Sequence, residues 1–277
     1  MSILRNLFYS LPTGFRFVAR NIVYYPVDVI DGLRGKRDKN VPPKRMIYTG
    51  GGDFLKIGNK IVDHIKAQNI ITPHSKVLDV GSGIGRIAIP LTKYLTDGIY
   101  EGFDIVKSGV KWCEQHISHN FPNFHFQWIP LSNDLYRDAG KDAGQFVFPY
   151  EDETFDLAIV ISVFTHMQPA EVENYLNEIR RVLKHDGYCY ATFFILNQDS
   201  EEAMQTSNEF NFKYHHGHFS LLNEKVKAAN VAFREKYLDD LFVNAHFNVV
   251  GKDYGSWSGA YPESAFDFQD TVVLKRN

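Results

Sequence analysis

The sequence has few cysteines and no long uncharged apolar run. Only Cys113 and Cys189 occur in 277 residues, which is too few for a disulfide framework and is typical of a reducing compartment. No stretch approaches the roughly 18 apolar residues of a membrane-spanning helix. An early apolar run is interrupted by Arg5 and ended by Pro12 and Gly14, unlike a secretory signal. We therefore expect a cytoplasmic protein.

A basic excess is also missing, since the formal net charge is -3. This balance gives no support to nucleic-acid binding. Residues 1–40 are nevertheless basic, with seven Lys or Arg against three Asp. We expect an N-terminal arm over residues 1–45 that acts as a lid or packing element, or else rests on an anionic membrane surface. Pro12 and Gly14 should interrupt any long helix, which favours the lid or packing role.

Apolar runs of strand character alternate with segments of helical periodicity from residue 53 onward. This alternation predicts an α/β domain with a parallel sheet and right-handed crossovers. The last two strands have no helix between them and should be antiparallel neighbours. The expected strands are 76–80, 99–105, 124–129, 155–164, 188–195, 246–254 and 270–275, and the expected helices are 53–69, 85–95, 108–120, 168–184 and 234–245.

A polar segment breaks this alternation. Residues 196–232 look irregular, and a segment that long inside a compact fold is usually functional, so we expect a cap inserted after the fifth strand. His215, His216 and His218 lie in it, and three histidines can ligate a metal. Adjacent histidines on an extended chain rarely point at one ion. We therefore favour a polar, aromatic-rich cap loop and expect no metal.

Three glycines occupy alternate positions between an expected strand and helix. Gly81, Gly83 and Gly85 lie in DVGSGIGR, where glycine permits a close ligand approach that a Cβ would block. The helix N-terminus that follows favours an anionic group of the ligand. A dinucleotide fingerprint needs glycine where this chain has Arg86. The spacing therefore argues against a nicotinamide cofactor. The other alternative, a tight structural turn with no ligand, is also disfavoured.

Two acids flank this glycine loop. Asp79 stands two residues before the first glycine, and Asp104 ends the next expected strand. A carboxylate at the second position can accept hydrogen bonds from both hydroxyls of a ribose. This arrangement suits an adenosine ligand.

Four motifs in this order resemble those of the class I S-adenosylmethionine-dependent methyltransferases. VLDVGSGIG is similar to the first motif of that family, YEGFDI to the second, FDLAIVISVFTHM to the fourth-strand motif, and EIRRVLKHDGYCYATFF to the next helix and fifth strand. The resemblance covers residues 50–195 well and 233–277 more weakly. It implies a seven-stranded, mostly parallel Rossmann-like sheet of order 3-2-1-4-5-7-6 with helices on both faces, and a methyltransferase domain over 46–277.

The resemblance also implies S-adenosylmethionine as methyl donor and S-adenosylhomocysteine as product. Asp79 would receive the methionine amino group, directly or through water, and Asp104 would hold the ribose. Arg86 would pair with the ligand carboxylate or remain a solvated arginine of the first helical turn. The residues expected at the donor are Asp79, Gly81, Ser82, Gly83, Gly85, Arg86, Asp104, Ile105, Leu131, Asn133, Ser162, Tyr48, Thr49 and Gly50.

One stretch departs from the family pattern. After the third strand the family often has Asp followed by a small apolar residue near the adenine, whereas this chain reads WIPLSND with Pro130 at the corresponding place. Leu131, Asn133 or Asp134 would then take over the adenine contacts. The later change from LKPGG to LKHDG alters a turn.

A second glycine cluster precedes the first expected helix. In IYTGGGDF, Tyr48 and Thr49 stand before Gly50. The cluster is either a lid over the donor, which would exclude water from the reaction, or a plain linker. We favour the lid.

His166 follows the fourth expected strand in SVFTHMQP, at the sheet edge where α/β sites lie. An imidazole there is suited to remove a proton from a hydroxyl nucleophile. The alternative is a structural or donor-lining histidine. Trp257 and Tyr261, in GSWSGAY, either line an acceptor pocket or pack in a hairpin connection.

These patterns lead to one functional hypothesis. We expect methyl transfer from S-adenosylmethionine to a small-molecule or glycan-type acceptor, at a hydroxyl, by in-line displacement. The alternatives are a nicotinamide-dependent oxidoreductase and a non-catalytic module that binds an adenosyl ligand. A protein acceptor and the oligomeric state stay open.

Overall fold

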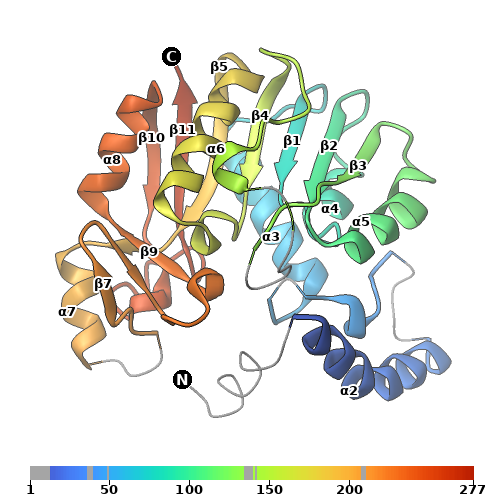
Figure 1. Cartoon of the computed structure of the whole chain (residues 1–277). Coiled ribbons are helices and arrows are strands. Elements are labelled where there is room, and N and C mark those ends of the chain that lie inside the picture. The colour runs from blue at the N-terminus through green and yellow to red at the C-terminus, as the bar shows by residue number, and fades with distance from the viewer. Residues whose placement is uncertain (1–12, 36–39, 49, 134–139, 141, 207–209) are drawn as a thin grey trace. The chain divides into compact units, whose positions relative to one another are not determined.

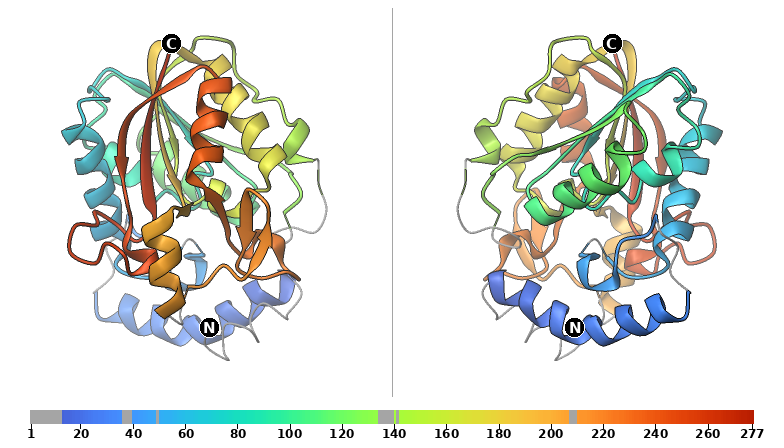
Figure 2. Two further views of the ribbon diagram at one scale, coloured as in Figure 1. Left: turned by 90° about the vertical axis from the view of Figure 1, so that its left-hand side faces the viewer. Right: turned by 90° about the vertical axis from the view of Figure 1, so that its right-hand side faces the viewer.

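The computed structural model describes residues 13–35, 40–48, 50–133, 140, 142–206 and 210–277. A seven-stranded sheet has the order β10-β11-β5-β4-β1-β2-β3 (Figure 1). With the strands renumbered within this sheet, the order is the predicted 3-2-1-4-5-7-6, so the predicted fold class is confirmed. Figure 2 shows helices on both faces of this sheet.

One compact unit of the chain extends to Pro130. Its strands β1, β2 and β3 pair in parallel, with Lys76 opposite Ile99 and Tyr100 opposite Phe124. The elements are α2 (Thr13–Leu33), η1 (Lys44–Met46), α3 (Phe54–Ala67), β1 (Lys76–Val80), α4 (Ala88–Leu91), β2 (Ile99–Asp104), α5 (Lys107–Cys113), η2 (Glu114–Ser118) and β3 (Phe124–Trp128). Four of the five residues of β1 are buried, as expected of a parallel strand covered on both faces.

The other compact unit contains Leu131–Asn277. Strand β4 runs parallel to β5, whereas β11 is antiparallel to both β5 and β10. The elements of the large sheet and its helices are η3 (Ala143–Gln145), β4 (Phe155–Val160), η4 (Phe164–His166), α6 (Pro169–Val182), β5 (Leu183–Phe193), α8 (Glu235–Asn244), β10 (Phe247–Asp253), η6 (Ser256–Ser258) and β11 (Asp270–Arg276). The predicted antiparallel pairing of the last two strands is confirmed.

The segment predicted to be irregular forms a second sheet. Its four strands have the order β6-β9-β8-β7. The elements are β6 (Ile195–Leu196), α7 (Gln198–Thr206), β7 (Tyr214–His216), β8 (Phe219–Leu221), η5 (Lys227–Ala229) and β9 (Val231–Arg234). Strands of two to four residues are too short to show an alternating pattern, which is why the sequence did not reveal them. The role of residues 196–232 as a cap stays a prediction.

The N-terminal arm also differs from its prediction. Helix α2 covers Thr13–Leu33 and includes Pro26, so the expectation that Pro12 and Gly14 interrupt any long helix is wrong. Pro12 directly precedes the helix in sequence, where a missing N–H breaks no internal hydrogen bond. Gly14 falls in the first turn. No helix among the described residues is both long and apolar enough to cross a bilayer.

Helix ends were predicted less well than strand order. The helix expected over 85–95 is reduced to α4, Ala88–Leu91, with turns on either side. The helix expected over 108–120 becomes α5 followed by the π-helical turn η2. The helix expected over 168–184 ends at Val182, and β5 begins at Leu183 instead of residue 188.

Asp270, at the start of β11, joins three segments of its unit. Its carboxylate accepts hydrogen bonds from the backbone N–H of Gly255 at 2.7 Å and of Ile195 at 2.6 Å. The indole N–H of Trp257 is a third donor, at 2.8 Å. Burial raises the pKa of Asp270 to about 7, although the three donors oppose the rise. The carboxylate therefore orders the entry into the second sheet and the loop before β11.

We expect Asp270→Ala to lower the free energy of unfolding by about 3 kcal/mol or more, because each buried donor left unsatisfied costs roughly 1–3 kcal/mol. Urea unfolding monitored by circular dichroism measures this loss. Asp240→Ala is the control, since Asp240 forms an exposed ion pair with Lys236 at 2.7 Å and such pairs contribute under about 1 kcal/mol. Equal losses in the two variants would contradict the role given to Asp270.

Candidate active site

The loop after β1 follows a backbone path that requires glycine. The φ angle is +76° at Gly81, +60° at Gly83 and +81° at Gly85, a region that a Cβ disfavours. The N–H groups of Gly81 and Ser82 both donate to the carbonyl oxygen of Phe103, at 2.9 and 3.0 Å. The loop is thereby held against the end of β2.

Asp104, the last residue of β2, holds this loop from its other side. Its Oδ2 accepts a hydrogen bond from the N–H of Gly83 at 2.8 Å, and its Oδ1 accepts one from the N–H of Val106 at 2.7 Å. The hydroxyl of Tyr48 donates to Oδ1 at 3.3 Å. Burial raises the pKa of Asp104, and these three donors oppose the rise. A carboxylate has about four lone-pair positions, so Asp104 has the capacity to hold the loop and accept a ribose hydroxyl.

The segment around the second glycine cluster contacts the glycine loop. Besides the Tyr48 hydroxyl, the guanidinium of Arg86 donates to the carbonyl oxygen of Gly50 at 3.4 Å. The same guanidinium lies 5.2 Å from the centre of the Phe54 ring. Arg86 therefore joins the two glycine segments, and its pairing with a ligand carboxylate stays a prediction. Thr49 lies outside the described residues.

Gly109 in α5 was not among the predicted site residues. A Cβ at this position would lie 2.2 Å from the hydroxyl of Tyr48 and 2.7 Å from the carbonyl oxygen of Gly83. Tyr48, the glycine loop and α5 therefore pack with no room for a side chain. In the sequence, the feature that could have indicated this position is an isolated glycine inside a helical pattern.

Asp79 in β1 is a buried acid whose pKa is raised. Burial raises its pKa to about 7, Tyr100 opposes this rise, and the charge of Asp104 adds to it. The hydroxyl of Tyr100 donates to Oδ2 of Asp79 at 2.5 Å. A cationic ligand group would favour the ionised form. The predicted ammonium partner therefore matches the electrostatics of this carboxyl.

Ile105 is contacted by an aromatic residue that the sequence analysis did not select. The indole N–H of Trp128, at the end of β3, donates to the carbonyl oxygen of Ile105 at 3.1 Å. The ammonium of Lys107 lies 4.7 Å from the centre of the Trp128 ring. In the sequence, the feature that could have indicated Trp128 is its position as an aromatic residue at the end of an expected strand. Trp128 is a further candidate for contact with a planar ligand group.

The other predicted site residues belong to the unit that contains Leu131–Asn277. Leu131 is buried, and the amide of Asn133 donates to the carbonyl oxygen of His166 at 3.4 Å. Ser162 has a φ of +56°, a conformation that non-glycine residues adopt at some energetic cost. Its hydroxyl donates to the side-chain oxygen of Gln269 at 2.9 Å. Asp134 lies outside the described residues.

His166 ends the short helix η4, directly after the fourth strand of the large sheet. Its ring Nδ1 lies 2.7 Å from the backbone carbonyl oxygen of Ala228. A carbonyl oxygen only accepts hydrogen bonds, so Nδ1 carries the proton. In the neutral ring the basic lone pair is then on Nε2. The geometry fixes the tautomer that a proton-accepting Nε2 requires.

His166 also lines a cavity of about 410 Å³. Seven of the ten residues around it have a polar or charged side chain, and the other three are glycine or alanine. The lining residues are Ser132, Asn133, Gly140, Asp142, Ala143, His166, Gln168, Glu171, Lys227 and Ala228. The cavity is suited to a polar ligand rich in hydrogen-bonding groups.

Residues 78–191 match the family model of the methyltransferase domain. This match contains the glycine loop and extends to β5. Residues 78–191 are therefore similar to a methyltransferase domain, as the four sequence motifs also indicate. The match favours this family over the nicotinamide alternative.

Other known proteins resemble part of this chain or share its fold. A phthiotriol/phenolphthiotriol dimycocerosates methyltransferase of Mycobacterium ulcerans is 30% identical over 135 residues, which are 47% of this chain and 43% of that protein. This chain thus spans less than half the length of the curated relatives it matches. The crystal structure of a sarcosine dimethylglycine methyltransferase, described as putative, from Galdieria sulphuraria has a TM-score of 0.55 and 12% identity, over 80% of this chain and 85% of that one. The cyclase SpnF has a TM-score of 0.54 and 14% identity, over 96% of both chains. At these identities the structures show a shared fold alone.

The glycine loop of this chain fits S-adenosylmethionine, the methyl donor that the similarity to the methyltransferase domain implies. The three positive φ angles of the loop suit glycine, and a Cβ at Gly85 would lie 2.6 Å from Cδ1 of Ile117. Asp79 offers a buried carboxyl to an ammonium group, and Asp104 offers a fixed carboxylate to a ribose. These roles stay predictions at the level of single residues.

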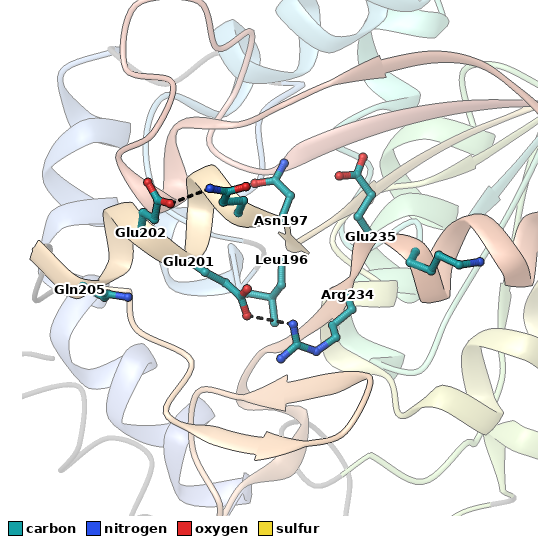
Figure 3. A pocket seen from close by; sticks show the side chains of 9 residues that line it. Leu196, Asn197, Glu201, Glu202, Gln205, Arg234 and Glu235 are labelled. Atoms are coloured by element: carbon teal, nitrogen blue, oxygen red, sulfur yellow. Dashed lines mark hydrogen bonds and ion pairs between the residues drawn. The ribbon is translucent and has the colours of Figure 1, made fainter.

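A second cavity, of about 500 Å³, lies between α7 and the start of α8 (Figure 3). Its charged groups already pair within the protein. Arg234 contacts Glu201 at 3.1 Å, and Glu235 accepts hydrogen bonds from Lys252 at 2.7 Å and from Tyr254 at 2.5 Å. We assign no ligand to this cavity.

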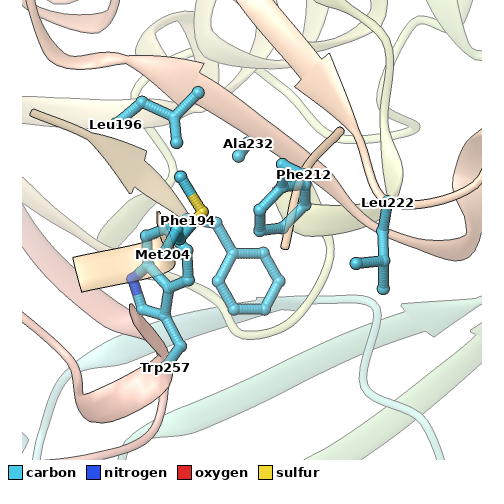
Figure 4. Packing of buried hydrophobic residues seen from close by; sticks show 7 residues of the cluster. All are labelled: Phe194, Leu196, Met204, Phe212, Leu222, Ala232 and Trp257. Carbon is cyan, nitrogen blue, oxygen red and sulfur yellow. The ribbon is translucent and has the colours of Figure 1, made fainter. Parts of the chain in front are cut away.

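Trp257 packs in the core of its unit. It contacts the rings of Phe194 and Phe212 at centroid distances of 5.4 and 5.5 Å (Figure 4). Tyr261 stacks on Tyr254 and donates to Asp199 at 2.8 Å. Between the two interpretations left open by the sequence, the structure supports packing for Trp257.

The three histidines of the second sheet have separate partners. His215 pairs with Ser220 at 2.9 Å, His216 stacks on Phe219, and His218 stacks on Tyr237. Among the described residues, no group of three or more His, Cys, Asp or Glu is arranged to hold a metal ion.

We expect Gly109→Ala to weaken binding of S-adenosylhomocysteine about ten-fold, because the added Cβ would displace the Tyr48 hydroxyl and the glycine loop. Isothermal titration calorimetry measures the affinity. Gly32→Ala is the matched control, since Gly32 is also helical and a Cβ there would meet nothing within 4 Å. Unchanged affinity in Gly109→Ala would show that this contact does not shape the cofactor site.

We expect the affinity for S-adenosylhomocysteine to fall by up to ten-fold per pH unit below about pH 7. Below its raised pKa, Asp79 holds a proton that must leave before the carboxylate pairs with the ligand ammonium. Titrations between pH 5 and 8 measure this slope. Methylthioadenosine, which lacks the amino-acid end but retains the ribose, is the control ligand and should show a shallower slope. Equal slopes for the two ligands would show that Asp79 does not bind the ammonium group of the ligand.

Proposed function

We propose that this methyltransferase transfers the methyl group of S-adenosylmethionine to a hydroxyl of a small-molecule or glycan-type acceptor. The observation that carries the proposal is the orientation of His166. Its Nδ1 donates to the carbonyl of Ala228, which makes Nε2 the proton acceptor of the neutral ring. A positioned base of this kind contributes roughly 10²–10⁴-fold to the rate.

The lining of the His166 cavity supports a polar acceptor. Side chains of Ser132, Asn133 and Lys227 lie around the same space, and hydroxyl, amide and ammonium groups are suited to bind the hydroxyls of a polyol or sugar. An apolar ring system would leave these groups desolvated. We therefore place the acceptor in this cavity.

The reaction is an in-line displacement. When bound, S-adenosylmethionine supplies an electrophilic methyl group on a sulfonium. The protein aligns the acceptor oxygen with that methyl group, and alignment of reactants can lower a barrier by roughly 7–11 kcal/mol. His166 takes the hydroxyl proton on Nε2 while Nδ1 keeps its hydrogen bond to Ala228.

Relatives of the chain support a hydroxylated acceptor. The similar proteins of Mycobacterium ulcerans and Mycobacterium tuberculosis are named for phthiotriol and phenolphthiotriol dimycocerosates, names that describe triols. We propose a hydroxyl-bearing lipid or glycolipid as one acceptor class. We also propose that residues 46–277 are the catalytic domain, with residues 196–232 as a cap and residues 1–45 as an accessory arm.

We expect His166→Ala to lower kcat by at least about 100-fold, because the acceptor hydroxyl loses its base. Transfer of radiolabelled methyl from S-adenosylmethionine into lipid and polyol fractions identifies the acceptor and measures turnover. The dissociation constant of S-adenosylhomocysteine should change by less than about 3-fold. Added imidazole should restore part of the rate.

His185→Ala is the control for this experiment, because the side chain of His185 is exposed and pairs with exposed Asp186. Its turnover should match that of the wild type. Unchanged turnover in His166→Ala would exclude the base role. Cofactor binding without turnover of any fraction by the wild type would support a non-catalytic binding module instead.

A further inference from the structure

Helix α2 turns its apolar side chains outward. Ile22 is 70% exposed and Leu33 is 84% exposed. At 3.6 residues per turn, the exposed apolar positions from Ile22 to Leu33 fall within one arc of about 160°, except Tyr24, which is 36% exposed on the other side. The other large side chains of this arc are Val23, Tyr25, Val29 and Ile30. We call these six residues the outer face of α2.

The acids of α2 lie on the opposite side and are held by their own unit. The carboxylate of Asp28 is buried and accepts hydrogen bonds from the backbone N–H of Lys44 at 2.6 Å and of Arg45 at 3.1 Å. Asp31 forms an ion pair with the Lys44 ammonium at 2.9 Å. A surface helix normally directs its apolar stripe inward and its charges outward. Helix α2 has the reverse orientation.

Charge favours one kind of partner for the outer face. The two acids of α2 point away from it, and exposed Arg34 follows the helix on the flank of the arc. Residues 1–40 carry seven basic residues against three acids. Helix α2 itself carries two Arg and two Asp, so the positive excess belongs to the whole arm of residues 1–40, and two such arms would repel each other if two copies met. An anionic surface would attract the arm and bury its apolar side chains at once.

We propose that α2 docks this protein on an anionic lipid bilayer, with the outer face in the interface and the helix axis parallel to the membrane plane. Helices that combine one apolar face with neighbouring Lys and Arg bind membrane surfaces in this way. Tyr25, an amphipathic aromatic residue, suits the headgroup level. The inference rests on α2, its contacts and the charge of residues 1–40, and it holds whatever the methyl acceptor is.

Vesicle sedimentation of the full chain tests this proposal. We expect the wild type to pellet with vesicles of phosphatidylcholine containing 30% phosphatidylglycerol, and far less with phosphatidylcholine alone or in 0.5 M NaCl. The double variant Ile30→Ser, Leu33→Ser should bind at least about ten-fold more weakly. Arg34→Gln should weaken binding to the anionic vesicles about five-fold, since one basic residue near such a surface contributes about 1 kcal/mol.

Val243→Ser, Val250→Ser is the matched control, because both valines are exposed outside α2, at 69% and 53%. It should sediment like the wild type. All variants should bind S-adenosylhomocysteine with wild-type affinity, which shows that they fold. Absence of wild-type binding to anionic vesicles would overturn the proposal, as would equal losses in the two double variants. A dimer that the α2 variant alone dissociates, without vesicle binding, would assign the outer face to a second copy.

Discussion

The two oxygens of the Asp104 carboxylate accept hydrogen bonds from backbone N–H groups of two different loops, and the candidate cofactor site depends on this arrangement. Gly83 belongs to the glycine loop and Val106 to the start of α5, while Tyr48 reaches the same carboxylate from a segment 56 residues earlier. Burial alone would favour the protonated acid. The three donors oppose this effect and favour the ionised carboxylate. The carboxylate in turn holds the loops that supply these donors.

The strand order and the glycine loop were predictable from the sequence for physical reasons. Parallel strands buried on both faces read as apolar runs, and glycine is the residue that tolerates the positive φ angles found at Gly81, Gly83 and Gly85. The second sheet was not predictable, because its strands have two to four residues. Helix α2 was not predicted, because proline and glycine break a helix when they lie in its interior. The helix begins at Thr13, so Pro12 precedes it in sequence and Gly14 falls in its first turn.

Contacts between distant residues were beyond a single sequence. The carbonyl of Ala228 orients the ring of His166 from 62 positions away, and nothing near either residue predicts that pair. Gly109 is a second example. A side chain is excluded there because the Tyr48 hydroxyl and the carbonyl oxygen of Gly83 lie close by, and both residues are distant in sequence. Sequence patterns predicted His166 and the glycine loop as parts of the site. The tautomer of His166 and the close packing at Gly109 depend on contacts that only the three-dimensional structure shows.

Exposed apolar residues alone need no functional explanation, because every folded protein has some. The orientation of α2 is different in kind. A rotation of the helix about its axis would turn Asp28 and Asp31 toward solvent and the outer face inward, which is the usual arrangement. The hydrogen bonds from the backbone of Lys44 and Arg45 to Asp28 oppose that rotation, because the buried Asp28 carboxylate would lose both of these donors. Polar contacts therefore fix the orientation of α2, and they keep its apolar residues available for contact with lipid.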